Sequence, residues 1–345
     1  MGKKLFELSF SELQKSLIEM GEKKFCAKQI ADWVYQKGVS DWTQMTNLSQ
    51  GLRDKLTNEF ENVSFTLVRE QHSDDEQTIK FLWKLHDDRL VESVLIMSDE
   101  RRTVCVSSQV GCPARCAFCA SGQNGFMRNL EIYEIVLQVF LIQQYLAKKG
   151  ERVSHIVYMG MGEPFRNYEN VVQSIKILCD PEFFGLSQRR ITVSTVGVVE
   201  GISRFANEGL KVNLVLSLHA PNQKIRQKII PYARQYPIDL LISAMRMYSE
   251  KTKRDITFEY TLLSRINDQE EHAEELAGLL KGIQCTVNLI PYNPVPGIKL
   301  HRPETSTIKT FWRILEDSGI VTTCRYTKGD DIKAACGQLA LQVAS

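Results

Sequence analysis

From about residue 100 onward, short apolar stretches rich in β-branched residues alternate with longer amphipathic stretches, such as 130–148 and 168–178. This alternation predicts a parallel sheet, because parallel strands need long crossover connections that are usually helical. Six or so βα units are too few for a closed eight-stranded barrel. We therefore expect an α/β fold built as a partial (β/α)6-type barrel, open on one side. The predicted strands are Thr103–Gln109, His155–Met159, Ile191–Thr195, Val212–Leu218, Ile256–Leu262, Thr286–Ile290 and Val321–Arg325.

Two smaller regions precede this core. Residues 1–62 are expected to form a small helical domain, in which Ser9 and Glu12 have the spacing of a helix-capping pair. Residues 63–98 are expected to form a β-hairpin extension, because Thr78–Leu85 and Leu90–Met97 alternate with a period of two around a polar turn. Residues 99–345 then form the barrel core, which ends in a cysteine-containing loop.

Composition narrows the class of protein. Apolar residues make up 43% of the 345 residues, and no apolar run approaches the roughly 20 residues that cross a bilayer. The polar start does not predict a signal peptide. Nine cysteines, an odd number, favour a reducing compartment in which thiols serve metals and chemistry. We therefore expect a cytoplasmic protein without membrane association; the net charge of +2 neither requires nor excludes nucleic acid.

Three cysteines follow the first predicted strand of the barrel. Cys112, Cys116 and Cys119 form a Cys-x3-Cys-x2-Cys motif. Three thiolates in one loop can hold three irons of a [4Fe–4S] cluster and leave the fourth iron for a substrate. The alternatives are a zinc site, which usually needs four ligands, and a disulfide, which needs an oxidising compartment. The spacing favours the cluster, because the next cysteine is Cys179.

Polar residues stand at the ends of other predicted strands, where parallel α/β folds place their sites. Each is weak alone: a Gly-x-Gly-Glu segment is often an ordinary turn, and a strand-end histidine is often a packed residue. Around one cluster loop they predict a binding ring. The arrangement is similar to that of radical S-adenosylmethionine (SAM) enzymes, in which the open iron chelates SAM. The residues of the predicted ring are Gly162, Glu163, Ser194, Ser217, Leu218, His219 and Asn293.

The residues alone do not decide the roles of two further cysteines. Cys105 lies in the first predicted strand, and Cys336 lies between a Gly-Asp-Asp segment and a glycine. A free cysteine is usually a small buried hydrophobe. A mobile polar loop around Cys336 would equally suit a reactive thiolate.

Several motifs together closely resemble the RlmN/Cfr group of radical SAM RNA methyltransferases, over about residues 20 to 340. Both extra cysteines occur at the matching places. The motifs are Cys105–Cys112, the cluster loop, Gly125–Leu130, Met159–Pro164, Ser217–Asn222 and the C-terminal segment from Gly329 to Leu339.

The resemblance implies a mechanism. Cys336 receives a methyl group from one SAM and becomes S-methylcysteine. A second SAM on the cluster yields a 5′-deoxyadenosyl radical, which removes a hydrogen from that methyl so that its carbon joins the base. Cys105 then resolves the adduct by forming a transient disulfide with Cys336, and Glu92 is the proton acceptor. The cluster ligands are Cys112, Cys116 and Cys119, and the strand-end ring binds SAM.

The resemblance also implies the substrate and partners. We expect methylation at C2 of an adenosine in the peptidyl transferase centre of 23S ribosomal RNA (rRNA), and of an adenosine beside the anticodon of transfer RNA (tRNA). Alternatives are C8 methylation, another radical SAM reaction, or a zinc-stabilised RNA-binding protein. We expect a monomer that takes electrons from a donor such as reduced flavodoxin. RNA contacts are expected from the helical domain and from Arg101, Arg102, Arg128, Arg189 and Arg190.

Overall fold

One ten-stranded sheet organises the molecule, whose computed structural model describes residues 2–61, 63–123, 125–324 and 328–339. The spatial order of the strands is β1-β2-β3-β4-β7-β8-β9-β10-β11-β12. The strands are β1 (Thr66–His72), β2 (Thr78–Lys84), β3 (Leu90–Ser98), β4 (Arg101–Cys105), β7 (His155–Tyr158), β8 (Ile191–Thr195), β9 (Asn213–Ser217), β10 (Ile256–Leu262), β11 (Cys285–Pro291) and β12 (Val321–Cys324).

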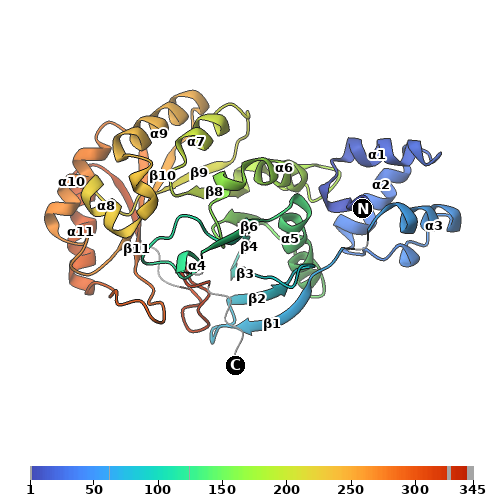
Figure 1. The fold of residues 1–345 in the computed structure, drawn as a ribbon, viewed down its shortest axis with the longest axis horizontal. Helices are drawn as coiled ribbons and strands as arrows, with labels where there is room; N and C mark the ends of the chain where they lie inside the picture. The colour runs from blue at the N-terminus through green and yellow to red at the C-terminus, as the bar shows by residue number, and fades with distance from the viewer. Residues whose placement is uncertain (1, 62, 124, 325–327, 340–345) are drawn as a thin grey trace.

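All neighbouring strands from β4 to β12 are parallel, and β1 and β12 are the two edges of the described sheet. Helices follow the parallel strands and lie around the outside of the curved sheet (Figure 1). The expected open α/β barrel is therefore confirmed. The helices are α5 (Ile132–Ala147), α6 (Tyr168–Cys179), α7 (Val199–Phe205), α8 (Gln223–Ile229), α9 (Ile238–Thr252), α10 (Glu270–Leu280) and α11 (Thr305–Asp317).

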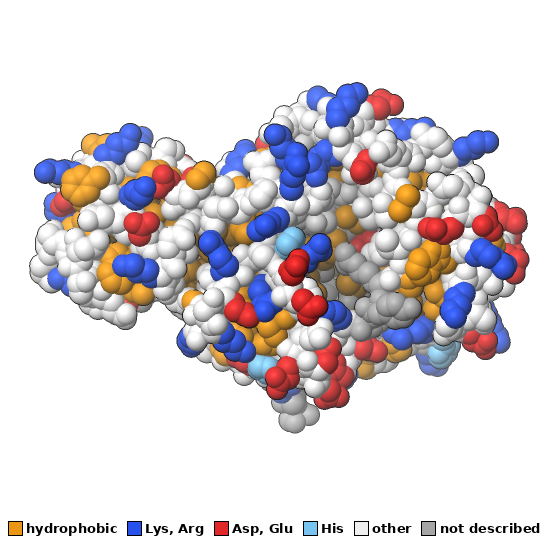
Figure 2. Space-filling view, turned by 180° about the vertical axis from the view of Figure 1, so that it is seen from behind, with side chains coloured by type: hydrophobic (Ala, Val, Ile, Leu, Met, Phe, Trp, Pro, Cys, Tyr) orange, Lys and Arg blue, Asp and Glu red, His pale blue; other side chains and the backbone are white. Residues whose placement is uncertain are grey.

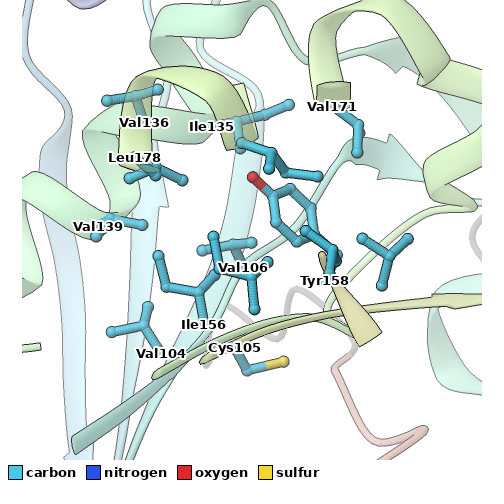
Figure 3. Close-up of a cluster of buried hydrophobic side chains, with 14 of the residues drawn as sticks. Val104, Cys105, Val106, Ile135, Val136, Val139, Ile156, Tyr158, Val171 and Leu178 are labelled. Atoms are coloured by element: carbon cyan, nitrogen blue, oxygen red, sulfur yellow. The ribbon is translucent and has the colours of Figure 1, made fainter. Parts of the chain in front are cut away.

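The two faces of the sheet differ sharply near β4. Val104 and Val106 point into an apolar cluster against α5 and α6, whereas the sulfur of Cys105 points away from it (Figure 3). Alternation along a strand produces this division. The outer face thus forms the helix-covered core, and the inner face carries the polar residues of the site.

The predicted hairpin is confirmed as β2 and β3, which pair from Lys84↔Leu90 to Thr78↔Ile96. It extends the barrel sheet, because β3 also pairs with β4, with Val94 opposite Cys105. Strand β1 adds a further antiparallel neighbour on the other side of the hairpin.

The predicted strand Thr103–Gln109 is wrong beyond Cys105. The Val106 N–H still bonds to Val157 of β7 (3.0 Å), but the Ser108 N–H bonds to the Met161 carbonyl in the chain after β7 (2.8 Å). Gln109–Gly111 is a separate strand, β5, which pairs with β6 (Phe126–Asn129) in a two-stranded sheet. At the other end of the chain, β12 ends at Cys324, and the predicted last residue Arg325 lies outside the described residues.

The N-terminal helices form a lobe beside the barrel (Figures 1 and 2). They are α1 (Phe10–Glu19), α2 (Cys26–Ala31) and α3 (Gln50–Glu59), with a π-helical turn at Asp32–Gln36. The expected capping box of Ser9 and Glu12 is present. Aromatic contacts join the lobe to the barrel: Phe6 packs on Phe140 of α5, and Tyr35 packs on Phe183. No described helix is long and apolar enough to cross a membrane.

Candidate active site

The cysteine loop leaves β5 at Gly111 and runs to the short helix α4 (Ala120–Gln123). Gly111 has φ +75°, and a Cβ there would lie 1.8 Å from the carbonyl oxygen of Gly125. Only glycine permits this conformation and this approach. The same carbonyl accepts a hydrogen bond from the Cys112 N–H (3.0 Å), so the turn fixes the first cysteine directly.

The three loop thiols lie within electrostatic reach of one another. Burial, reinforced by the neighbouring thiol of Cys119, raises the pKa of Cys112 to about 12. Burial and both neighbouring thiols raise the pKa of Cys116 well above its usual value, and burial also raises that of Cys119. Three crowded thiolates are unfavourable unless cations neutralise them, which the irons of a cluster would do. The donor set therefore fits an iron–sulfur cluster.

The zinc alternative requires side chains gathered around one ion. In the described part of the chain, no three His, Cys, Asp or Glu side chains are arranged to hold a single metal ion. In a [4Fe–4S] cluster each cysteine binds a different iron, so the three thiols of the loop do not have to converge on a single metal ion.

Most of the predicted site residues line one cavity of about 140 Å³ at the carboxyl edge of the sheet. Leu218 is fully buried behind the cavity wall, and Cys112, Cys105 and Glu92 are also outside the lining. The structure therefore brings the cluster loop, the strand ends and the C-terminal cysteine together. The predicted residues in the lining are Cys116, Cys119, Gly162, Glu163, Ser194, Ser217, His219, Asn293 and Cys336.

Gly162 and Glu163 hold neighbouring loops in place. A Cβ on Gly162, which has φ +107°, would lie 2.6 Å from the Cβ of Gln109, so the glycine permits close packing on the chain itself. The Glu163 carboxylate accepts hydrogen bonds from the Thr195 hydroxyl (2.7 Å) and from the N–H groups of Val196 (2.7 Å) and Phe165 (3.0 Å). Burial raises its pKa. The carboxylate thus ties the loop after β7 to the end of β8.

Sequence reasoning missed Glu259 on β10. Its carboxylate accepts hydrogen bonds from Ser194 and Ser217, both at 3.4 Å, and the two hydroxyls lie 3.1 Å apart. The register pairs Ser217 with Glu259, so all three side chains share the inner face. A single glutamate in the otherwise apolar and hydroxyl-bearing strand Ile256–Leu262 was the available signal.

His219 is held as a neutral hydrogen-bond donor. Burial, with a contribution from the Arg226 charge, lowers the pKa of His219 to about 3. Its Nδ1 accepts a hydrogen bond from the Thr261 N–H (2.9 Å), which leaves the proton on Nε2. The backbone has φ +54°, and the Asn267 side chain binds the His219 carbonyl (2.8 Å) and stabilises this turn.

The segment that carries Cys336 is attached to both the barrel and the cluster loop. The Asn293 amide donates to the Cys336 carbonyl (3.2 Å), and the N–H of Ala120 donates to the Gly337 carbonyl (2.7 Å). Arg302 in turn donates to the Asn293 side-chain oxygen (3.0 Å). Cys336 itself is exposed.

Cys105 and Glu92 lie on the inner face, although they do not line the cavity. Cys105 is opposite Val94 on β3, and Glu92 is two residues before Val94, so both side chains point to the same side. The register continues from Cys105 through Val157 of β7 to β8, which places Ser194 on this side too.

The expected RNA-binding arginines are not gathered at the site. Arg102 pairs with Glu151 (2.5 Å), and Arg128 pairs with the fully buried Glu134 (2.7 Å). The other three lie at or just before the amino ends of β4 and β8, at the opposite edge from the cavity. That these five arginines contact RNA therefore stays a prediction, and none of them lines the cavity. Lys and Arg side chains are instead scattered over both lobes on the face seen in Figure 2.

Comparisons with known proteins agree with this geometry. The family model of the ribosomal RNA large subunit methyltransferase N-terminal domain matches residues 3–61, and the radical SAM superfamily model matches residues 106–277. A Protochlamydia amoebophila protein described as probable dual-specificity RNA methyltransferase RlmN 2 is 67% identical over 322 residues, which cover 93% of this chain and 90% of the relative. A Geobacillus kaustophilus protein described as probable dual-specificity RNA methyltransferase RlmN is 46% identical over 97% of this chain and 92% of its own.

A solved structure matches along almost the whole chain. The crystal structure of a radical SAM methyltransferase from Sphaerobacter thermophilus superimposes with a TM-score of 0.95 at 44% sequence identity. The match covers 98% of this chain and 99% of the other.

Proposed function

Because the chain belongs to the RlmN family of radical SAM RNA methyltransferases and uses a [4Fe–4S] cluster and SAM, we propose that its product is 2-methyladenosine. The proposed targets are an adenosine of 23S rRNA in the peptidyl transferase centre and the adenosine beside the anticodon of tRNA. The observation that carries the proposal is the attachment of the Cys336 segment to the cluster loop through Ala120 and Gly337. This attachment holds an exposed thiol beside the cavity.

The chemistry of the base explains why a thiol is needed there. The C2 carbon is electron-poor and does not attack a SAM methyl group as a nucleophile. When bound, the cluster and SAM supply a 5′-deoxyadenosyl radical. Cys112, Cys116 and Cys119 would hold the cluster. SAM would be held by Gly162, Glu163, Ser194, Ser217, Leu218, His219 and Asn293.

Cys336 is the proposed methyl carrier. Its thiolate attacks the methyl carbon of one SAM, so that a new sulfur–carbon bond forms, the bond to the sulfonium breaks and S-adenosylhomocysteine leaves. A second SAM is consumed when a hydrogen atom is removed from that methyl, whose carbon then bonds to C2. The adduct would next lose one electron, which a bound cluster would accept, and the C2 proton, which Glu92 would take up.

Cys105 is the proposed resolving residue. Its thiolate attacks the Cys336 sulfur, which forms a disulfide and breaks the bond from that sulfur to the methylene carbon. The released electron pair and one proton complete the methyl group. The shared inner face of Cys105 and Glu92 supports both assignments.

We assign residues 1–62 to RNA binding, 63–98 to the hairpin extension, and 99–345 to the catalytic core with the Cys336 loop. Exposed basic side chains of the N-terminal lobe, including Lys23 and Lys24, support RNA contact there. We further propose a cytoplasmic monomer that receives electrons from a donor such as reduced flavodoxin.

Nucleoside mass spectrometry of rRNA and tRNA from a deletion strain tests the function. We expect 2-methyladenosine to disappear from both RNAs and to return when the gene is restored. Loss of 8-methyladenosine instead would assign the alternative C8 reaction. Unchanged methyladenosines would favour a different radical SAM reaction.

A further inference from the structure

A buried lysine lies beside the proposed proton acceptor. The Nζ of Lys80, on β2, is 3.4 Å from a carboxylate oxygen of Glu92 on β3. The two side chains are only 7% and 3% exposed. Lys80 pairs with Val94, which in turn pairs with Cys105, so Lys80 belongs to the inner face together with Glu92 and Cys105.

The same ammonium also reaches the segment that carries Cys336. Lys80 Nζ donates to the backbone carbonyl of Lys333 (3.2 Å), three residues before Cys336. Other bonds fasten this segment to the hairpin: Lys328 donates to the Met97 carbonyl (3.1 Å), and the Asp74 N–H donates to Asp331 (2.7 Å). Lys80 is the cation that joins the proposed base to the proposed methyl carrier's loop.

Burial disfavours the charged form of Lys80. Burial lowers the pKa of Lys80, the positive charges of Lys333 and Arg69 lower it further, and Glu92 opposes the shift. A buried ammonium is favourable only when it is paired and hydrogen-bonded, which Glu92 and the Lys333 carbonyl provide. The same contact holds the Glu92 carboxylate in one position. A proton acceptor must lie within reach of the proton that it removes.

We propose that Lys80 is a positioning residue for RNA methylation, which orients the Glu92 carboxylate toward the Cys336 loop. This inference rests on the function proposed above. It assigns Lys80 to the second half of the reaction, in which the base gives up its proton. The first half, in which Cys336 is methylated, does not use Glu92.

A double-mutant cycle between Lys80 and Glu92 tests the inference. The reconstituted enzyme, its variants Lys80→Met, Glu92→Gln and the double variant are given SAM, a reductant and 23S rRNA fragments. Methylation of Cys336 is followed by mass spectrometry of the protein, and 2-methyladenosine by mass spectrometry of the RNA. Lys84→Met, on the same strand but paired with Asp88 at the surface, is the matched control.

We expect Lys80→Met to slow formation of 2-methyladenosine by tenfold or more, while Cys336 methylation and iron content change less than about twofold, with the tenfold loss corresponding to about 1.4 kcal/mol. The double variant should be no slower than Glu92→Gln alone, because Lys80 acts through Glu92. Lys84→Met should match the parent enzyme.

Two results would overturn the assignment. If the two single effects multiply in the double variant, Lys80 acts independently of Glu92. If Lys80→Met loses Cys336 methylation and iron together with RNA methylation, Lys80 has only a structural role. A failure of the proposed function is recognised in the parent enzyme. If the parent forms neither methylated Cys336 nor 2-methyladenosine, the proposed function itself is wrong.

Discussion

The side-chain amide of Asn293 donates a hydrogen bond to the backbone carbonyl of Cys336, 3.2 Å away. Asn293 follows β11 and lines the cavity, so this bond connects the wall of the cavity to the residue proposed to carry the methyl group. Arg302 holds the other end of the same amide, through its oxygen. The position of the thiol thus depends on a chain of three residues.

Removing the Asn293 amide should loosen this loop. One such hydrogen bond contributes about 1 kcal/mol, so Asn293→Ala should slow methylation of Cys336 by about fivefold or more. The rate is measured by mass spectrometry of the protein with SAM alone. Asn207→Ala, an exposed residue near the end of α7, is the control and should keep the parental rate. Equal rates for the parent and Asn293→Ala would show that this hydrogen bond does not position Cys336.

Gly111→Ala should prevent assembly of the cluster. The added Cβ would collide with the Gly125 carbonyl at 1.8 Å, which would displace the turn before Cys112. We expect less than half of the parental iron content after anaerobic reconstitution. Gly209→Ala is the control: Gly209 also has a positive φ of +68°, but a Cβ there would meet no atom within 4 Å. This variant has the backbone strain without the collision, and it should retain its iron. Full iron loading of Gly111→Ala would show that the turn does not define the site.

His219 should make the protein sensitive to acid. In the unfolded chain a histidine takes up a proton as the pH falls below about 6.5, whereas the folded protein resists until about pH 3. Stability is therefore fully present above about pH 6.5 and is lost as the pH falls below it. Between about pH 7.5 and pH 5 the parent should lose about 2 kcal/mol more unfolding free energy than His219→Gln. Urea unfolding measures the difference, and identical losses would contradict the neutral, buried state of His219.

Cys105→Ala should trap a covalent complex between protein and RNA. Without the resolving thiol, the bond between the Cys336 sulfur and the methylene carbon has no partner for exchange. A denaturing gel with labelled RNA should show a shifted band during turnover. Cys285→Ala, at the amino end of β11 and far from the cavity edge, should show none. If Cys105→Ala releases methylated RNA at the parental rate, the resolving role is wrong.

The sequence predicted the parallel barrel well, because the alternation of strands and helices is a local pattern. It misplaced the end of the strand from Thr103, because Ser108 and Gln109 bond to Met161, in a loop that is distant in the chain. The cluster motif and the strand-end residues were readable from spacing. Their convergence with Cys336 was not, because it depends on long-range bonds such as that of Ala120 to Gly337.

Other parts of the site had little local signal. Glu259 is the single charged residue of β10, and Lys80 is one of two lysines on β2. Their partners become visible only through the sheet register. The positions of the five arginines were not readable either, since a charge in the sequence does not show which edge of the barrel it occupies. Arg128, for example, is bound to Glu134.

The isotopic composition of the product tests the central claim most directly. The enzyme is given SAM with a fully deuterated methyl group, and the nucleosides of the treated 23S rRNA are analysed by mass spectrometry. Transfer through Cys336 predicts 2-methyladenosine that retains two deuterium atoms and carries one hydrogen from solvent, with the third deuterium in 5′-deoxyadenosine; Cys336→Ala should give no product. A product that keeps all three deuterium atoms, or that is methylated at C8, would contradict the account.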